Sequence, residues 1–253
     1  MRRMLFLATA LLGLVGCSVK SDRTWCPCIV DLTMSETSEE LVDVLAWADT
    51  LVHSDNVRVP QGGCVHEFEA PRRRMTVCAF SGLHCCSLEG RSVISPPGTQ
   101  MDELYVWTSE LVPEGETVSA EVHQHKQFAH IHLTMIFPDD SHQQERVRFV
   151  GNVAGVDLTT LNPVKGDFLV ESYPVYGTYY RVSVPRQTDD SLELVFPDTG
   201  RTLPLGRHIA SSGFDWTKTD LDDVNIILLY DVEMKITIEV MPWNDTDNED
   251  VII

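Results

Sequence analysis

Basic residues are scarce in this sequence of 253 residues. It has 19 lysines and arginines against 38 aspartates and glutamates, and the formal net charge at pH 7 is −19. This charge disfavours binding to a nucleic-acid backbone or to an anionic lipid surface, because both carry charge of the same sign. We therefore expect no nucleic-acid partner, and we interpret the charge chiefly as a source of solubility.

Catalytic motifs are also missing. The sequence has no Gly-x-Ser-x-Gly, no phosphate-binding glycine loop and no His-Glu-x-x-His. We therefore predict neither an enzyme nor a cofactor, and we expect no small-molecule substrate.

Five histidines do gather in the middle of the chain. They are His123, His125, His130, His132 and His142. Pairs at i, i+2 share one face of a strand and could bind a transition metal. No third ligand or orienting carboxylate is defined for them, however. We interpret the group as the solvated side of an ordinary strand and predict no metal; an enzyme that uses these histidines is the least favoured hypothesis.

Long apolar runs are confined to the N-terminus. Residues 1–16 combine a positive end, an apolar stretch and a small residue before a cysteine, which is typical of a bacterial export signal. The stretch is shorter than the roughly 20 residues that a bilayer core requires. Its ending, Leu14-Val15-Gly16-Cys17, looks like a lipobox. We predict a lipoprotein signal peptide at 1–16, lipid attachment at Cys17 and a lipidated tether at 17–25; the alternative is a secreted protein with a free Cys17.

Six further cysteines all precede residue 90. They are Cys26, Cys28, Cys64, Cys78, Cys85 and Cys86. In an exported chain disulfides persist, although the sequence does not choose among the pairings. The single residue between Cys26 and Cys28 is too short a spacing for two thiolates on one structural zinc. We expect structural disulfides that involve only the first half of the chain.

Short segments bounded by Gly, Pro, Asp and Ser predict a mainly β fold. Examples lie at 74–80, 103–108, 129–137 and 191–196. One helix is expected between Ser35 and Ala48, because Leu41, Val44 and Leu45 recur at helical spacing behind acidic residues. A polar segment with Pro and Gly at 111–119 predicts a domain boundary. We expect β-sandwiches at 26–118 and 119–253, with the helix in the first.

The C-terminal region has the clearest strand pattern. Apolar and polar residues alternate without a break from 232 to 240, which fixes the register of a half-buried strand. Its apolar face consists of Val232, Met234, Ile236, Ile238 and Val240. The strand either closes its own domain or leaves to complete a neighbour's sheet. An acidic tail follows at 244–250.

A series of short motifs resembles the FimB-type fimbrillin-associated anchor proteins of type V pili. The likeness extends over nearly the whole mature chain. Its motifs are the lipobox, Asp22-Arg23, Cys26-Pro-Cys28, Ala70-Pro-Arg72, Lys126-Gln-Phe-Ala129, Thr202-Leu-Pro-Leu-Gly206, Leu221-Asp-Asp-Val-Asn-Ile226, and Trp243 after the terminal strand.

The resemblance implies two tandem transthyretin-like β-sandwiches displayed from the outer membrane. In that family the anchor catalyses no reaction; its lipid stays in the membrane and its body caps the base of a fimbria. Shaft subunits lose a first strand to an arginine-specific protease and accept the C-terminal strand of another subunit, whereas the anchor keeps its N-terminus. The resemblance thus implies fimbrial shaft subunits as partners, Cys17 as the tether and residues 232–240 as the donor strand.

One alternative is a surface adhesin, or an accessory or tip subunit, that binds a glycan or a host protein. Arginines at positions 23, 58 and 72–74 leave open whether the chain is cut by a protease.

Overall fold

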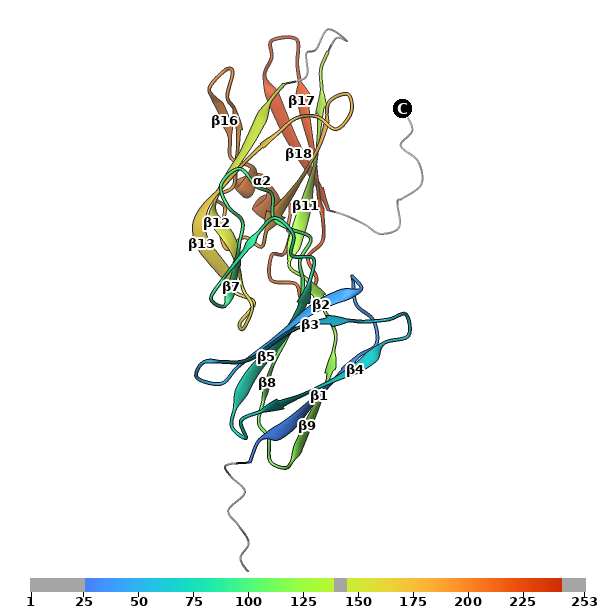
Figure 1. Cartoon of the computed structure of the whole chain (residues 1–253). Helices are drawn as coiled ribbons and strands as arrows, with labels where there is room; N and C mark the ends of the chain where they lie inside the picture. Colours follow the sequence, from blue (N-terminus) through green and yellow to red (C-terminus); the bar gives the residue numbers. More distant parts are fainter. Residues whose placement is uncertain (1–25, 139–144, 243–253) are drawn as a thin grey trace, which may run out of the picture.

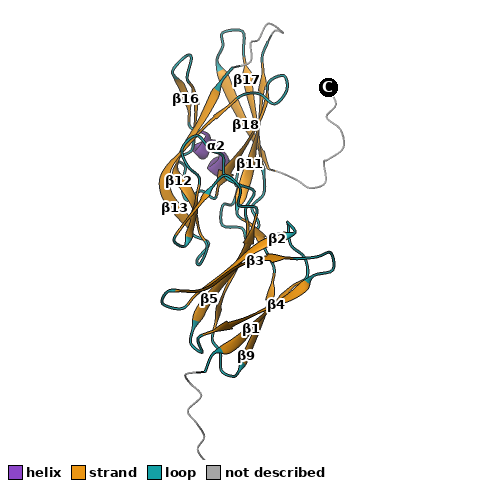
Figure 2. Cartoon of the chain, in the orientation of Figure 1, coloured by secondary structure: helices purple, strands orange, loops and turns teal. Residues whose placement is uncertain are grey.

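Two β-sandwiches, one above the other in Figure 1, make up the computed structural model, which describes residues 26–138 and 145–242. Strands dominate both halves, as Figure 2 shows. The predicted fold class, mainly β with tandem sandwiches, is confirmed. Within the described ranges no helix has the length and the apolar character needed to cross a membrane.

The first sandwich packs a three-stranded sheet, in the order β4-β1-β9, against a five-stranded sheet, in the order β10-β8-β5-β2-β3. Its strands are β1 (Cys28–Met34), β2 (Leu41–Trp47), β3 (Leu51–Arg58), β4 (Cys64–Ala70), β5 (Met75–Ser81), β8 (Tyr105–Leu111), β9 (Thr117–Val122) and β10 (His125–Lys126).

Strand β1 shows why these residues form a sandwich. Cys28, Val30, Leu32 and Met34 are fully buried, whereas Ile29 on the opposite face is 43% exposed. This alternation directs every second side chain into the space between the two sheets. The buried residues of β1 pack there with apolar residues of β2 and β5.

The predicted helix is wrong, because its region forms strand β2. Val44 and Ala46 face the core of the first sandwich, whereas Leu45 and Trp47 face a second apolar cluster on the other side of the sheet. A strand covered on both faces has apolar residues at successive positions, and these include the three- and four-residue spacings of a helix. The acidic residues before Leu41 lie instead in the loop that precedes this strand.

The second sandwich packs a four-stranded sheet, in the order β14-β11-β17-β18, against a six-stranded one. The latter has the order β16-β15-β12-β7-β6, with β13 also paired to β12. Its elements are β6 (Ser87–Glu89), β7 (Ser92–Ile94), β11 (Phe128–Ile136), β12 (Val147–Asp157), β13 (Pro163–Ser172), β14 (Tyr179–Pro185), β15 (Glu193–Phe196), β16 (Arg201–Leu203), helix α2 (Leu205–Ser211), β17 (Val224–Tyr230) and β18 (Ile236–Pro242).

The two halves exchange segments, so the predicted boundary at 118/119 is not where one sandwich ends. Strands β9 and β10 complete the first sandwich, which places the crossover after Lys126. Strands β6 and β7, from the first half of the chain, join the second sandwich, where Val93 pairs with Val156. The helix also differs from the prediction, since α2 lies in the second sandwich.

A shared apolar cluster holds the halves together. Trp47 and Phe80 from the first sandwich pack in one group with Val93, Phe128 and Val156. Backbone hydrogen bonds from the segment after β7 support this contact: Gly98 N–H donates to Leu169 O at 2.7 Å, and Met101 N–H to Ser183 O at 3.1 Å. Apolar burial and main-chain bonding therefore fix the junction together.

Candidate functional site

The terminal strand β18 lies at the edge of its sheet. It pairs antiparallel with β17, from Tyr230 opposite Ile236 to Val224 opposite Pro242. Among the described residues no strand pairs with its other side. Ile236, Ile238 and Val240 are half-buried against the core of the second sandwich. In this structure β18 therefore closes its own domain.

The other two residues of the predicted apolar face lie outside the strand. Val232 is 85% exposed and Met234 is 44% exposed, and both belong to the turn between β17 and β18. Asp231 builds this turn, because its Oδ1 accepts hydrogen bonds from the N–H groups of Glu233 and Lys235, each at 2.8 Å. Met234 adopts a φ of 59° there. The strand predicted for 232–240 thus begins four residues later.

Cys17, the predicted lipid site, lies outside the described residues, as do His142 and the acidic tail. The described chain begins two residues before β1, at the end of the first sandwich that is remote from β18 (Figure 1). A tether attached there would leave the terminal strand at the opposite part of the molecule.

The six described cysteines are free thiols, so the structure does not show the predicted disulfides. Strand geometry explains one excluded pair: Cys28 lies opposite Ala70, whereas Cys64 lies opposite Met34 at the other end of β1. That separation is roughly 20 Å along the strand, well beyond the reach of a disulfide. Cys78 faces the apolar cluster on the other side of the five-stranded sheet.

Most of the predicted histidine cluster lies at the junction of the two sandwiches, where each ring has its own partners. His123 lies 3.4 Å from Glu121 on an exposed surface. His125 Nδ1 lies 3.0 Å from Asp220. His132 Nδ1 lies 2.5 Å from the Tyr179 hydroxyl. Within the described part of the chain, these histidines do not gather with a carboxylate around one point.

His130 is the buried member of this group. Its Nε2 accepts a hydrogen bond from the Arg181 guanidinium at 2.6 Å, and Arg181 also contacts Glu103 at 3.1 Å. Burial lowers the pKa of His130, Asp223 and Glu103 oppose the shift, and the Arg181 charge adds to it, which leaves a pKa of about 4. His130 is therefore neutral at pH 7, so the 3.2 Å approach of its Nε2 to Glu103 is not an ion pair at that pH.

Asp223 connects the two halves through three groups. Its Oδ1 lies 2.6 Å from Lys126 Nζ in β10 and accepts the His130 N–H of β11 at 2.8 Å, while its Oδ2 lies 3.8 Å from His132 Nε2. Burial opposes the charged form, but the nearby His132 and the hydrogen bonds from Lys126 and the His130 N–H outweigh it and lower the pKa of Asp223. The carboxylate is therefore a charged link across the junction.

An open cleft of about 500 Å³ lies beside this junction. Its polar lining includes His84, Gln100, Glu103 and Arg181. Asp102 also lines the cleft, and its carboxylate holds residues 84–86 in place by accepting their three successive backbone N–H groups at 2.8–3.1 Å. The cleft combines fixed polar groups with a solvent-accessible opening.

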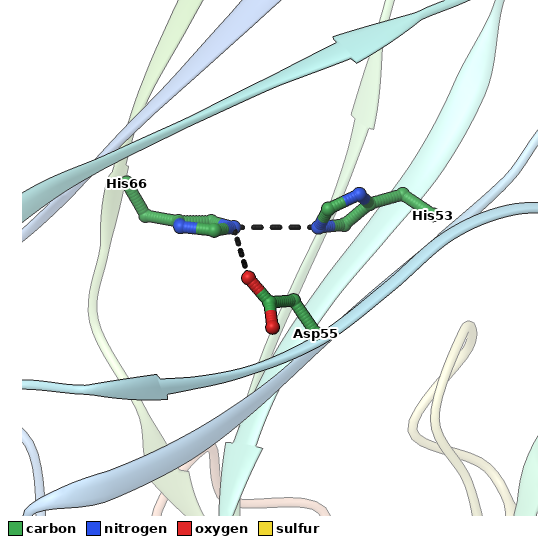
Figure 3. A group of neighbouring side chains, drawn as sticks. All are labelled: His53, Asp55 and His66. Atoms are coloured by element: carbon green, nitrogen blue, oxygen red, sulfur yellow. Dashed lines mark hydrogen bonds and ion pairs between the residues drawn. The ribbon is translucent and has the colours of Figure 1, made fainter.

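A second group of polar side chains was not expected from the sequence. His53 and Asp55 on β3 meet His66 on β4, as Figure 3 shows. His53 Nε2 lies 3.3 Å from His66 Nε2, and Asp55 Oδ2 lies 3.8 Å from the same nitrogen. The only sequence signal was the i, i+2 spacing of His53 and Asp55, which gives no indication that His66 would face them.

No protein-family model matches the chain, and no curated protein matches its sequence. Solved structures do share its fold. A candidate adhesin from Bacteroides ovatus aligns with a TM-score of 0.60 at 12% identity, covering 86% of this chain and 94% of that one. A candidate adhesin from Bacteroides thetaiotaomicron aligns with a TM-score of 0.59 at 11% identity, covering 86% and 97%.

The fimbrial anchor protein Mfa2 from Porphyromonas gingivalis has the same fold as well. It aligns with a TM-score of 0.57 at 12% identity, covering 86% of this chain and 98% of Mfa2. At these identities the likeness shows a common tandem-sandwich architecture that extends over nearly the full length of each relative.

Proposed function

We propose that this protein is an outer-membrane lipoprotein that anchors the base of a fimbria and stops its growth there. The observation that carries the proposal is the full-length likeness of fold to Mfa2, a protein described as a fimbrial anchor. The lipobox ending at Cys17 supports attachment to the membrane. Cys17 holds the lipid in this proposal, and a fimbrial shaft subunit is the partner.

We further propose that β18 forms the joint with that subunit by leaving its own sheet and completing the partner's. The strand pairs only with β17 within the described chain, so its departure breaks a single strand interface. A strand inserted along its length resists pulling through many hydrogen bonds that break together. Ile236, Ile238 and Val240 would each contribute about 1.5–3 kcal/mol when buried in a partner, as upper bounds.

A disulfide that locks β18 onto β17 tests this joint better than a deletion. Removing β18 would uncover the core beneath it and could unfold the domain. Asn225 and Met241 are directly opposed across the two strands, at the end remote from their turn. Opposed residues of an antiparallel pair lie at a Cα separation that suits a disulfide.

The double variant Asn225→Cys/Met241→Cys should release long fimbriae into the medium when the bridge has formed, as verified by peptide mass spectrometry. The two single-cysteine variants are the matched controls and should keep fimbriae attached to the cell. Fimbriae that remain attached to cells carrying the locked protein would show that β18 does not leave its sheet.

The junction cleft favours a second candidate function, a surface protein that binds a glycan or a host protein. Its polar groups are held in place, which is typical of a binding site that fixes ligand orientation. This function predicts that the purified protein binds glycans or host-cell surfaces without other fimbrial proteins, and that Arg181→Ala weakens binding. Binding that is absent from the purified protein would exclude it.

A further inference from the structure

The group made by His53, Asp55 and His66 lies where the two sheets of the first sandwich meet at an open edge. Strand β3 ends the five-stranded sheet and β4 ends the three-stranded sheet. His53 lies opposite Ala46 and Asp55 opposite Val44, two fully buried residues of the sandwich core. Opposed residues share a face of the sheet, so both polar side chains point inward.

His66 points inward from the other sheet. It lies opposite Leu32 of β1, which is fully buried. Inward polar groups can by themselves protect an edge strand from pairing with another chain. Protection of an edge does not require three potential ligand atoms to approach one another. Here all three lie within 4.8 Å of one another.

The three ligand atoms lie within 4.8 Å of one another, which brings them near the spacing of a metal site. In tetrahedral zinc sites, bonds of about 2.0–2.2 Å place ligand atoms roughly 3.3–3.6 Å apart. In the structure, the separations are 3.3 Å between the two histidine Nε2 atoms and 3.8 Å between His66 Nε2 and Asp55 Oδ2. We propose that His53, Asp55 and His66 bind a divalent transition-metal ion such as Zn²⁺. The ion would link β3 to β4 across the edge of the sandwich.

The surroundings prepare the ligands for this role. The ring of His53 stacks on Phe68 with a centroid distance of 3.8 Å and an interplanar angle of 11°, which restricts its orientation. Burial and the neighbouring His66 lower the pKa of His53, while Asp55 opposes the shift. Two imidazoles and one carboxylate leave the fourth position of a tetrahedral site open. Asp55 is exposed, so this open position faces solvent.

Zinc titration of the purified full-length chain tests the site. We expect one Zn²⁺ per chain by isothermal titration calorimetry, and a Tm that rises by roughly 5–10 °C when Zn²⁺ exceeds its Kd about 100-fold. His53→Gln, Asp55→Asn and His66→Gln should each weaken binding by at least about tenfold, since even residues that only orient metal ligands commonly contribute that much.

His123→Gln and His132→Gln are the matched controls, because they remove histidines that lie outside the group. Both should keep the affinity and the Tm rise of the wild type. Zinc binding that survives in the three ligand variants, or that is lost in His132→Gln, would overturn the proposal. So would a wild-type protein that binds no zinc.

Chemical labelling gives an answer that does not depend on how the variants fold. In the wild type, Zn²⁺ should reduce diethyl pyrocarbonate modification of His53 and His66 several-fold, as read by peptide mass spectrometry. His123 should be modified equally with and without metal. Unchanged labelling of His53 and His66 at saturating zinc would contradict the assignment.

Discussion

The carbonyl oxygen of Val93 lies 2.0 Å from the position that a Cβ atom on Gly155 would take. The two residues belong to β7 and β12, where a hairpin from the first half of the chain pairs with the sheet of the second sandwich. A backbone oxygen cannot move aside as a flexible side chain can. Any side chain at position 155 must therefore push these strands apart.

Gly155→Ala should lower the free energy of unfolding by about 1–3 kcal/mol, the usual cost of an extra methyl group in a packed region. Urea denaturation measures this change. Gly115→Ala is the control, because the nearest atom to its added Cβ would be Thr117 O at 3.9 Å, an ordinary contact. Equal effects of the two substitutions would contradict the tight pairing of β7 with β12.

His130 should make the protein less stable in mild acid. Its folded-state pKa of about 4 lies below the ordinary value of 6.5, so the unfolded chain takes up the proton first. The contribution of neutral His130 to the free energy of unfolding is fully present above about pH 6.5. It falls by up to about 3 kcal/mol as the pH approaches 4.

Denaturation of His130→Gln between pH 4 and 7 should show a weaker dependence of stability on pH than the wild type. His123→Gln is the control, since its side chain is 70% exposed, and it should keep the wild-type profile. An unchanged profile for His130→Gln would show that another group is responsible.

Arg186 should be among the residues that contribute most to stability near the junction. Its buried guanidinium donates to Trp216 O at 2.5 Å, to Lys218 O at 2.7 Å and to the Gln127 side chain at 3.1 Å. Arg186→Ala leaves these acceptors without a donor and should cost about 2–4 kcal/mol in urea denaturation. Arg207→Ala removes an arginine with an exposed ion pair and should cost less than about 1 kcal/mol.

The cysteines should differ in reactivity according to burial. Cys26 and Cys85 are exposed, whereas burial raises the pKa of Cys86 to about 12 and also raises that of Cys78. Alkylation of the folded, unreduced protein should label the first two rapidly and the last two only after unfolding. A disulfide-linked peptide in the mass map would contradict this pattern and support the bridges expected from the sequence.

Sequence patterns located most strands but not the environment on each side of them. The segment predicted at 129–137 forms β11, and the alternation of Ile236, Ile238 and Val240 correctly indicates a half-buried strand. The pattern failed at β2 because the junction covers its second face, which cannot be seen in local periodicity. It failed at Val232 because the side chain of Asp231 stabilises a turn there.

The His53, Asp55 and His66 group could not have been predicted from spacing. His53 and Asp55 belong to one sheet and His66 to the other, and their meeting depends on how the edges of these sheets approach. The sequence instead emphasised histidines that are close along the chain. At the junction those histidines have separate partners such as Asp220 and Tyr179.

The exchange of strands between the two halves also sets the order in which the chain can fold. The hairpin of β6 and β7 is made early in the chain but finds its partner only when β12 is available. The first sandwich needs β9 and β10, which follow that hairpin. Pairings between distant segments slow folding and leave strand edges open in the meantime. We therefore expect the two sandwiches to fold as one cooperative unit, and a fragment ending at residue 126 to expose the unpaired hairpin and aggregate.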